Sequence, residues 1–162
     1  MSDTTDTTAA TRASGASDTS TQIYRVFIKA APERIWQAIT SPDDSVHYFH
    51  GGRITNTADE HTSTGPDGSD WGGGAVLEFD PPRRLSYEWV SAYDPDAGDE
   101  PPSRVTWELE PAEGGITLVT LTHDRLERSP KTAEGVSGAG WMFVLSGLKT
   151  YLETGEELVA AT

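Results

Sequence analysis

The segment between Ser129 and Gly155 carries a stripe of large apolar residues that must be buried. These residues recur at steps of three and four, the spacing of one face of an α-helix: Trp141, Val144, Leu145, Leu148, Tyr151 and Leu152. Ser129 followed by Pro130 is typical of a helix start, and Gly155 is typical of a helix end. The sequence therefore predicts one long C-terminal helix with a face that needs an apolar partner.

The middle of the chain, residues 53–125, can supply that partner surface. Short segments with a period of two follow one another, separated by turns such as GPDG at 65–68, and no helical pattern intervenes. The residues expected on one face are mostly apolar or aromatic: Ala75, Leu77 and Phe79; Leu85, Tyr87, Trp89 and Tyr93; Val105, Trp107 and Leu109. This pattern predicts an antiparallel meander with one apolar face.

The beginning of the chain divides into a polar tail and the start of the domain. Residues 1–20 contain no aromatic residue and no Ile, Leu or Val, so we expect a disordered tail there and one folded domain over residues 21–158. Residues 22–29 alternate as a strand does, and two short helices are expected before Gly51. The predicted fold is α+β: a curved antiparallel sheet wrapped around a long C-terminal helix, with two short helices after the first strand.

Charge and cysteine content exclude several classes of function. The net charge is −14, from 26 acidic and 12 basic side chains, which disfavours nucleic acid and anionic membranes as partners. No apolar run is long enough to span a membrane, and the N-terminus does not resemble a signal peptide. The absence of cysteine excludes thiolate metal sites and fits a reducing compartment. We therefore expect a cytoplasmic protein without membrane insertion.

Five stretches in a fixed order carry a family resemblance: APERIWQAIT, EFDPPRRLSYEW, SRVTWELEP, TLVTLTHDRL and GWMFVLSGLKTYLETG. Together they resemble the START-like (SRPBCC) helix-grip superfamily, in the branch related to the C-terminal domain of activators of the heat-shock-protein-90 ATPase. The resemblance covers residues 23–156. It implies a cavity between sheet and helix that holds a small, largely hydrophobic molecule or lipid. Two glycine-rich stretches, 51–74 and 134–140, depart from the branch pattern.

Aromatic residues are the candidates for the wall of such a cavity. We expect Trp89, Trp107, Tyr87 and Trp141 on that wall, and we add Phe79 and His123, which fall on the same predicted apolar faces. Rings that carry an N–H or O–H group suit an apolar pocket with few polar groups. Core packing is the competing interpretation for most rings of this set, which also includes Trp71.

The histidines raise the questions of metal binding and catalysis. His47 and His50, with Asp43 and Asp44 upstream, could share one helical face, but two such ligands do not make a zinc site, and a surface or pocket-rim position is expected. His123 could act as an acid–base group in the cavity, or it could simply be hydrogen-bonded at a strand end. We predict no metal and no cofactor, and the sequence assigns no catalytic residue.

Three functions remain open from the sequence. The first is binding of a hydrophobic ligand without catalysis. The second, implied by the resemblance because the superfamily includes cyclases and hydrolases, is an enzyme that uses the same cavity, with His123 or a tyrosine as the acid–base group. The third, implied by the resemblance, is a co-chaperone-like interaction with a heat-shock ATPase. The Arg83–Arg84 pair in FDPPRRLSYEW is expected to form a corner between strands rather than an anion site.

Overall fold

The computed structural model describes residues 20–159, so the predicted tail at 1–20 lies almost entirely outside the described residues. Seven strands form one antiparallel sheet in the order β1-β7-β6-β5-β4-β3-β2. The strands are β1 (Gln22–Ile28), β2 (Arg53–Asn56), β3 (Glu60–Thr64), β4 (Asp70–Asp80), β5 (Arg84–Trp89), β6 (Ser103–Pro111) and β7 (Thr117–Asp124). The helices are α2 (Pro32–Thr40), α3 (Pro42–Ser45), α4 (Pro130–Val136) and α5 (Ala139–Thr154).

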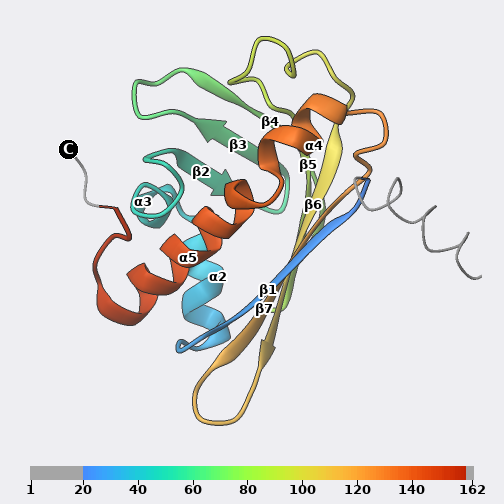
Figure 1. The fold of residues 1–162 in the computed structure, drawn as a ribbon. Helices are drawn as coiled ribbons and strands as arrows, with labels where there is room; N and C mark the ends of the chain where they lie inside the picture. Colours follow the sequence, from blue (N-terminus) through green and yellow to red (C-terminus); the bar gives the residue numbers. More distant parts are fainter. Residues whose placement is uncertain (1–19, 160–162) are drawn as a thin grey trace, which may run out of the picture.

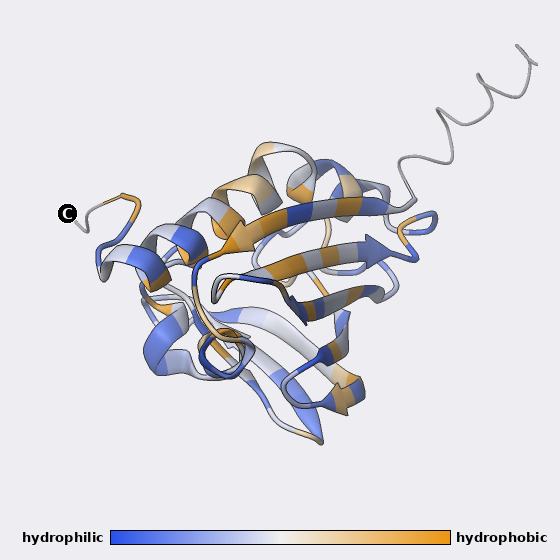
Figure 2. Ribbon diagram, turned by 90° about the horizontal axis from the view of Figure 1, so that it is seen from below, coloured by the Kyte–Doolittle hydropathy of each residue, from blue (hydrophilic) through white to orange (hydrophobic). Residues whose placement is uncertain are grey.

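The core lies between the sheet and the helices that cross one face of it. Figure 1 shows α5 running across the sheet, with the short helix α2 on the same side. The inward residues of β5, β6 and β7 are buried as predicted, and the buried stripe of α5 (Trp141, Val144, Leu145 and Leu148) packs into the same cluster. Figure 2 shows apolar and polar residues alternating along the strands, as expected for a sheet with one buried face. The predicted α+β fold is therefore confirmed.

Strand β4 departs from the predicted alternation. The register shifts between Val76 and Glu78, because Leu77 is an extra residue opposite β5. Val76 and Phe79 pack against the core, whereas Ala75 and Leu77 are exposed. The prediction that Ala75, Leu77 and Phe79 share one inward face is therefore wrong. A bulge reverses the alternation, and the residue pattern alone carries no sign of it.

Tyr93 also leaves its predicted place. Strand β5 ends at Trp89, and the chain then turns into the loop that connects it to β6. The Tyr93 side chain is 47% exposed rather than aligned with Leu85, Tyr87 and Trp89 on the inner face. Alternation could not continue, because residues 90–102 are not in a strand.

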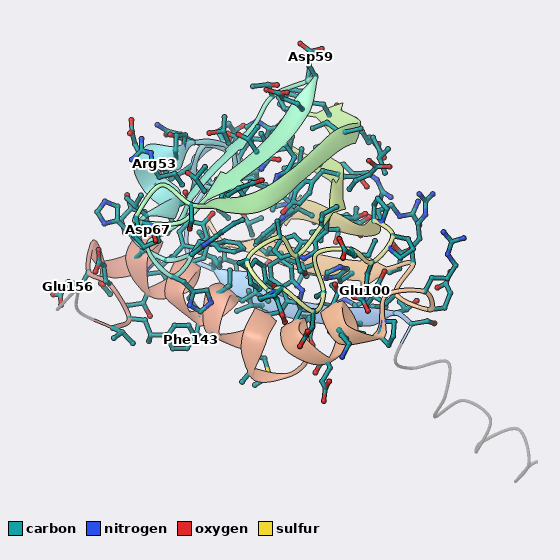
Figure 3. The ribbon with its side chains drawn as sticks, turned by 90° about the horizontal axis from the view of Figure 1, so that it is seen from above. Arg53, Asp59, Asp67, Glu100, Phe143 and Glu156 are labelled. Carbon is teal, nitrogen blue, oxygen red and sulfur yellow. The ribbon has the colours of Figure 1, made fainter. Side chains whose placement is uncertain are left out.

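The predicted single C-terminal helix is interrupted. Ser137 and Gly138 separate α4 from α5, and Gly138 has φ 55°, which favours glycine. Ser129 is the N-cap residue of α4, as predicted, but its side chain makes no cap hydrogen bond; its Oγ donates instead to the carbonyl of Pro101 at 2.6 Å. Glu100 of the preceding loop (Figure 3) supplies the missing cap by accepting hydrogen bonds from the backbone N–H groups of Lys131 and Thr132. The predicted end at Gly155 is confirmed by its left-handed backbone and its hydrogen bond to Tyr151.

A cluster of polar side chains fastens the helices to one another. The guanidinium of Arg34 on α2 pairs with both carboxylate oxygens of Asp44 on α3, at 3.2 and 3.0 Å. The hydroxyl of Tyr151 on α5 donates to the same carboxylate at 2.6 Å. Burial acts to raise the pKa of Asp44, but the hydrogen bonds from Arg34 and Tyr151 outweigh it and lower the pKa overall. Asp44 thus joins three helices through its ionised form.

Candidate functional site

A cavity of about 330 Å³ lies between α4 and α5, the broken helix pair, and the sheet around β3, the start of β4 and the end of β5. One side is formed by residues of α4 and α5: Gly135, Val136, Gly140, Trp141 and Val144. The other side is formed by residues of the strands and their loops: His61, Ser63, Trp71, Trp89, Val90 and Tyr93; Phe49 and His50 also line the cavity. His50, Tyr93 and Gly135 are exposed at the mouth. The volume falls at the lower end of the range for small-molecule sites, roughly 300–1,000 Å³.

The interruption of the C-terminal helix contributes to this space. A side chain on Gly140 would come within 3.0 Å of the carbonyl oxygen of Gly135, so the two helices approach closely where neither residue has a side chain. A Cβ atom on Gly135 would meet no atom within 4 Å, because it would stand in open space. The glycine-rich stretch 134–140 therefore leaves room that longer side chains would fill.

Two tryptophans and a phenylalanine form the inner wall. The ring centroids of Trp89 and Trp141 are 5.4 Å apart, and Phe49 lies edge-on to Trp141 at 5.9 Å. The indole N–H of Trp89 donates to the Oγ of Ser91 at 3.0 Å, and that of Trp141 donates to Nδ1 of His123 at 3.0 Å. Because both N–H groups already have protein partners, these two rings offer the cavity only apolar surface. The hydrogen bonds also hold both rings in fixed orientations.

The outer wall depends on glycines in the stretch 51–74. The half-buried ring of Trp71 lies over Gly52 and Gly65, where a Cβ atom would come within 2.4 and 2.5 Å of it. Tyr93 meets Trp71 edge-on, with centroids 6.1 Å apart. Glycine at these two positions is required sterically, since any side chain would displace the indole. The glycines by which this stretch departs from the family pattern thus make room for Trp71, which lines the cavity.

His61 on β3 is a polar residue of the cavity that the sequence reasoning missed. It is 3% exposed, and its ring stacks on Tyr87 with centroids 4.0 Å apart. Its Nδ1 lies 2.8 Å from Oδ1 of Asn56. Burial lowers the pKa of His61 to about 4, so the ring is neutral near pH 7. In the sequence, His61 and Ser63 are two residues apart, as residues on one face of a strand are. The stretch is too polar, however, for this spacing to indicate a half-buried strand.

Of the six residues predicted for the wall, Trp89 and Trp141 line the cavity. Tyr87 and Trp107 lie in the core beneath it, where the indole N–H of Trp107 donates to the hydroxyl of Tyr87 at 3.1 Å. Phe79 packs edge-on against Trp36, at 5.2 Å between centroids. His123 lies behind Trp141 rather than on the cavity surface. The structure therefore brings two of the six predicted residues together at the cavity.

His123 has the geometry of a hydrogen-bonded residue in the core. Its Nδ1 accepts from Trp141, so its Nε2 carries the proton and donates to the Oγ of Ser103 at 2.7 Å. Burial lowers the pKa of His123 to about 3, against a smaller opposite effect of Asp124. The carboxylate of Asp124 is itself engaged by Arg104. With both ring nitrogens occupied and no carboxylate to orient it, His123 is not arranged as a general base.

The remaining candidate groups have local partners. His47 lies 2.8 Å from Glu157 and outside the cavity, whereas His50 stacks on Phe143 at its rim, with centroids 5.3 Å apart. Phe143 projects from α5 and is 40% exposed (Figure 3). Within residues 20–159, no group of three or more His, Asp or Glu side chains could hold a metal ion.

Arg83 lies in the turn between β4 and β5, and Arg84 is the first residue of β5, as expected of a corner. Arg84 pairs with Glu78 and Glu108, and Arg83 pairs with Asp80 at 2.6 Å. Both guanidinium groups therefore already face carboxylates of the same chain. Such exposed pairs contribute about 0–1 kcal/mol each, and they leave no uncompensated positive charge for an external anion.

The antiparallel sheet, the long helix across it and the cavity between them define a helix-grip protein of the START-like class. A family model described as "Activator of Hsp90 ATPase homolog 1-like protein" matches residues 29–153, and the chain belongs to this family. The resemblance noted in the sequence is thereby confirmed. No curated protein sequence matches the chain.

Solved structures show the same fold. CalU16 from Micromonospora echinospora is 26% identical, with 82% of this chain and 73% of that chain covered and a TM-score of 0.61. The Aha1 dimer from Colwellia psychrerythraea is 23% identical, with 83% and 97% covered and a TM-score of 0.65. A protein from Mesorhizobium loti is 24% identical, with 82% and 96% covered and a TM-score of 0.65. None of the helices in the described part of the chain has the length and apolar character needed to cross a membrane.

Proposed function

We propose that the protein binds a small, largely apolar molecule in the cavity between the broken helix pair and the sheet. The observation that carries this proposal is the cavity itself: about 330 Å³ of space beside the core, walled by aromatic rings and bordered by exposed residues at its mouth. Transfer of apolar surface from water into such a site is favourable by roughly 25 cal/mol per Å².

The wall is preorganised for a neutral ligand. Trp89 and Trp141 are held by hydrogen bonds to Ser91 and His123, so a ligand need not order them on binding. None of the residues that line the cavity is a lysine, arginine, aspartate or glutamate. An ionised ligand would therefore lose its hydration without gaining a counter-charge.

The arrangement favours binding over the cyclase- or hydrolase-type alternative. His123, the best acid–base candidate in the sequence, is committed to Trp141 and Ser103 behind the wall. Tyr87 is buried in the core, and burial raises the pKa of its hydroxyl, which disfavours ionisation. His61 reaches the cavity, but its lowered pKa makes it a weak base.

A cavity-filling variant tests the proposal. Val144 lines the cavity from α5, so Val144→Phe should occupy the space that the ligand needs. We expect thermal shifts and native mass spectra with a panel of hydrophobic compounds to show binding by the wild type and a loss of at least about tenfold in affinity in the variant.

Met142→Phe is the matched control, because Met142 lies on the same helix two residues away and is 54% exposed. It should bind as the wild type does, and circular dichroism should show both variants folded. Failure of the whole panel to bind the wild type, or equal binding by Val144→Phe, would count against the proposal.

A further inference from the structure

One side of the cavity is polar. His61 and Ser63 are two residues apart on β3 and therefore project from the same face of the strand. Both line the cavity, and they are only 3% and 8% exposed. The wall around them is mostly apolar or aromatic, so any polar group of theirs that lacks a partner within the protein can be matched only from the cavity.

The proton position on His61 follows from its neighbours. The side-chain Nδ2 of Asn56 donates to the carbonyl oxygen of Ile39 at 2.9 Å, which fixes the amide so that Oδ1 faces the histidine. Because an amide oxygen can only accept, Nδ1 of His61 must carry the proton and donate to it. In the neutral ring, Nε2 is then an acceptor without a hydrogen.

Nε2 of His61 is open to the cavity. In the described part of the chain, every side-chain nitrogen or oxygen that is wholly shielded has a hydrogen-bond partner. Nε2 of His61 and Oγ of Ser63 have no partner among these residues, so they cannot be wholly shielded, and the cavity is the space that both residues border. A buried acceptor facing such a space matches a hydrogen-bond donor on a ligand.

The chemistry of the surrounding wall narrows the ligand further. Seven of the thirteen lining residues carry an aromatic ring, including Phe49, Trp71, Trp89 and Trp141. Aromatic ligands interact with such rings beyond simple area burial, through stacked and edge-on contacts. The indole N–H groups of Trp89 and Trp141 are already used within the protein, so the inner wall presents ring surface beside the acceptor on β3.

We propose, building on the ligand-binding function above, that the ligand is a neutral aromatic molecule with a hydroxyl or N–H group that donates a hydrogen bond to Nε2 of His61. His61 is then a specificity-determining residue, because a ligand of the same shape without a donor leaves Nε2 unpaired in the occupied cavity. The neutral state of His61 near pH 7, a consequence of its burial, keeps Nε2 an acceptor.

A set of matched probes tests this proposal. The wild type should bind 2-naphthol about three- to tenfold more tightly than 2-methoxynaphthalene, which lacks the donor, since one net hydrogen bond is worth about that factor. Decahydro-2-naphthol keeps the hydroxyl without the aromatic rings and should bind more weakly than 2-naphthol. Isothermal titration calorimetry, with Trp fluorescence for the weaker ligands, measures all three affinities.

Variants of the two polar residues locate the acceptor. His61→Phe keeps a ring against Tyr87 but removes Nε2, so it should bind 2-naphthol and its methyl ether with equal affinity. Ser63→Ala removes the other polar side chain of this strand face; whatever its effect on the two affinities, their ratio should stay that of the wild type. A preference that persists in His61→Phe but disappears in Ser63→Ala would assign the contact to Ser63 and overturn the proposal.

A measurement on the wild type covers the case in which His61→Phe does not fold. Long-range ¹H–¹⁵N spectra of the imidazole should show an unprotonated Nε2, whose resonance moves on addition of 2-naphthol but not of 2-methoxynaphthalene. No movement with either bound probe would overturn the proposal.

The outcomes also separate this proposal from the one on which it rests. If the wild type binds the two naphthalene probes with equal affinity, and Val144→Phe binds neither, ligand binding stands and the role of His61 is rejected. If decahydro-2-naphthol binds as tightly as 2-naphthol, only the statement that the ligand is aromatic is rejected. If none of the three probes binds, and the hydrophobic panel fails as well, both proposals are rejected.

Discussion

His61 and His123 are both buried and neutral, but their hydrogen-bond partners place the ring proton on different nitrogens: Nδ1 in His61 and Nε2 in His123. Asn56 accepts from Nδ1 of His61 and leaves Nε2 toward the cavity. Trp141 donates to Nδ1 of His123, whose Nε2 then donates to Ser103. The first arrangement leaves a lone pair for a ligand, whereas the second uses both nitrogens to hold the cavity wall in place. The role of each histidine is therefore decided by the atoms beside it.

These two residues predict a pH dependence of stability. Burial lowers their pKa values from 6.5 to about 4 for His61 and about 3 for His123, so the unfolded chain takes up protons first as the pH falls. Their contribution is fully present above pH 6.5 and is lost as the pH falls toward the folded pKa values. A pKa difference of one between the folded and unfolded chain corresponds to about 1.4 kcal/mol for each histidine. We therefore expect the free energy of unfolding to drop by a few kcal/mol between pH 7 and pH 5.

Urea denaturation at both pH values measures this loss. His61→Phe should show roughly half of it, because one of the two groups no longer titrates. A free energy of unfolding that stays constant between pH 7 and pH 5 would contradict the prediction.

At the scale of elements, two interruptions of regular structure shape the interior of the domain. The break at Ser137–Gly138 divides the C-terminal helix, and the bulge at Leu77 reverses the facing of β4. The first places two glycines where the helices meet above the cavity, and the second returns Phe79 to the core beside Trp36. Regular versions of either element would place side chains differently on the inner face.

The helix break can be tested with two alanine substitutions of opposite expected sign. Gly138 has φ 55°, where a Cβ atom is strained, so Gly138→Ala should destabilise the fold by about 1–2 kcal/mol. Gly135 lies within α4 with no atom near its would-be Cβ, so Gly135→Ala should stabilise it by about 0.5–1 kcal/mol. Thermal and urea denaturation measure both changes; a continuous helix would instead be stabilised by alanine at either position.

At the scale of the whole molecule, a single sheet supports both a filled core and an open cavity. The helices on its inner face are tied together by Asp44, which bonds to Arg34 and Tyr151. The whole chain carries a formal net charge of −14, and the ion pairs among residues 20–159 are mostly solvent-exposed. Exposed pairs contribute little, so repulsion among the excess carboxylates is the larger long-range effect.

This charge predicts that salt stabilises the protein. The distance over which charges act falls from about 10 Å at 0.1 M salt to about 3 Å at 1 M, which weakens repulsion in the compact state. We expect the melting temperature to rise by a few degrees between 0.05 and 0.5 M NaCl at pH 7.5. A fall in melting temperature over that range would show that screening of the ion pairs dominates instead.

The sequence predicted those parts of the fold that follow from local periodicity. The alternation in β5, β6 and β7 indicated their buried faces because nothing interrupts the pairing of these three strands. The stripe from Trp141 to Leu148 indicated the buried face of α5 for the same reason. The bulge at Leu77 was not predictable, since an extra residue in a strand is defined only by the strand opposite.

The candidate site was less predictable than the fold. Trp89 and Trp141 were found because aromatic residues on buried faces are the usual material of an apolar wall. Trp107 and Tyr87 fall on the same faces yet lie beneath the wall, because position along a strand does not show which part of the interior is left empty. His61 was missed because its burial depends on Asn56, Tyr87 and the helices across the sheet.

By itself, the sequence determined the family, the α+β class, the antiparallel meander and the apolar faces that meet inside the domain. These follow from residue type and spacing along the chain, which act over a few neighbouring residues. Only the tertiary structure decided where the cavity lies, which tryptophans face it and which nitrogen of His61 points into it. The physical reason is that empty space and proton positions depend on atoms brought together from distant parts of the chain.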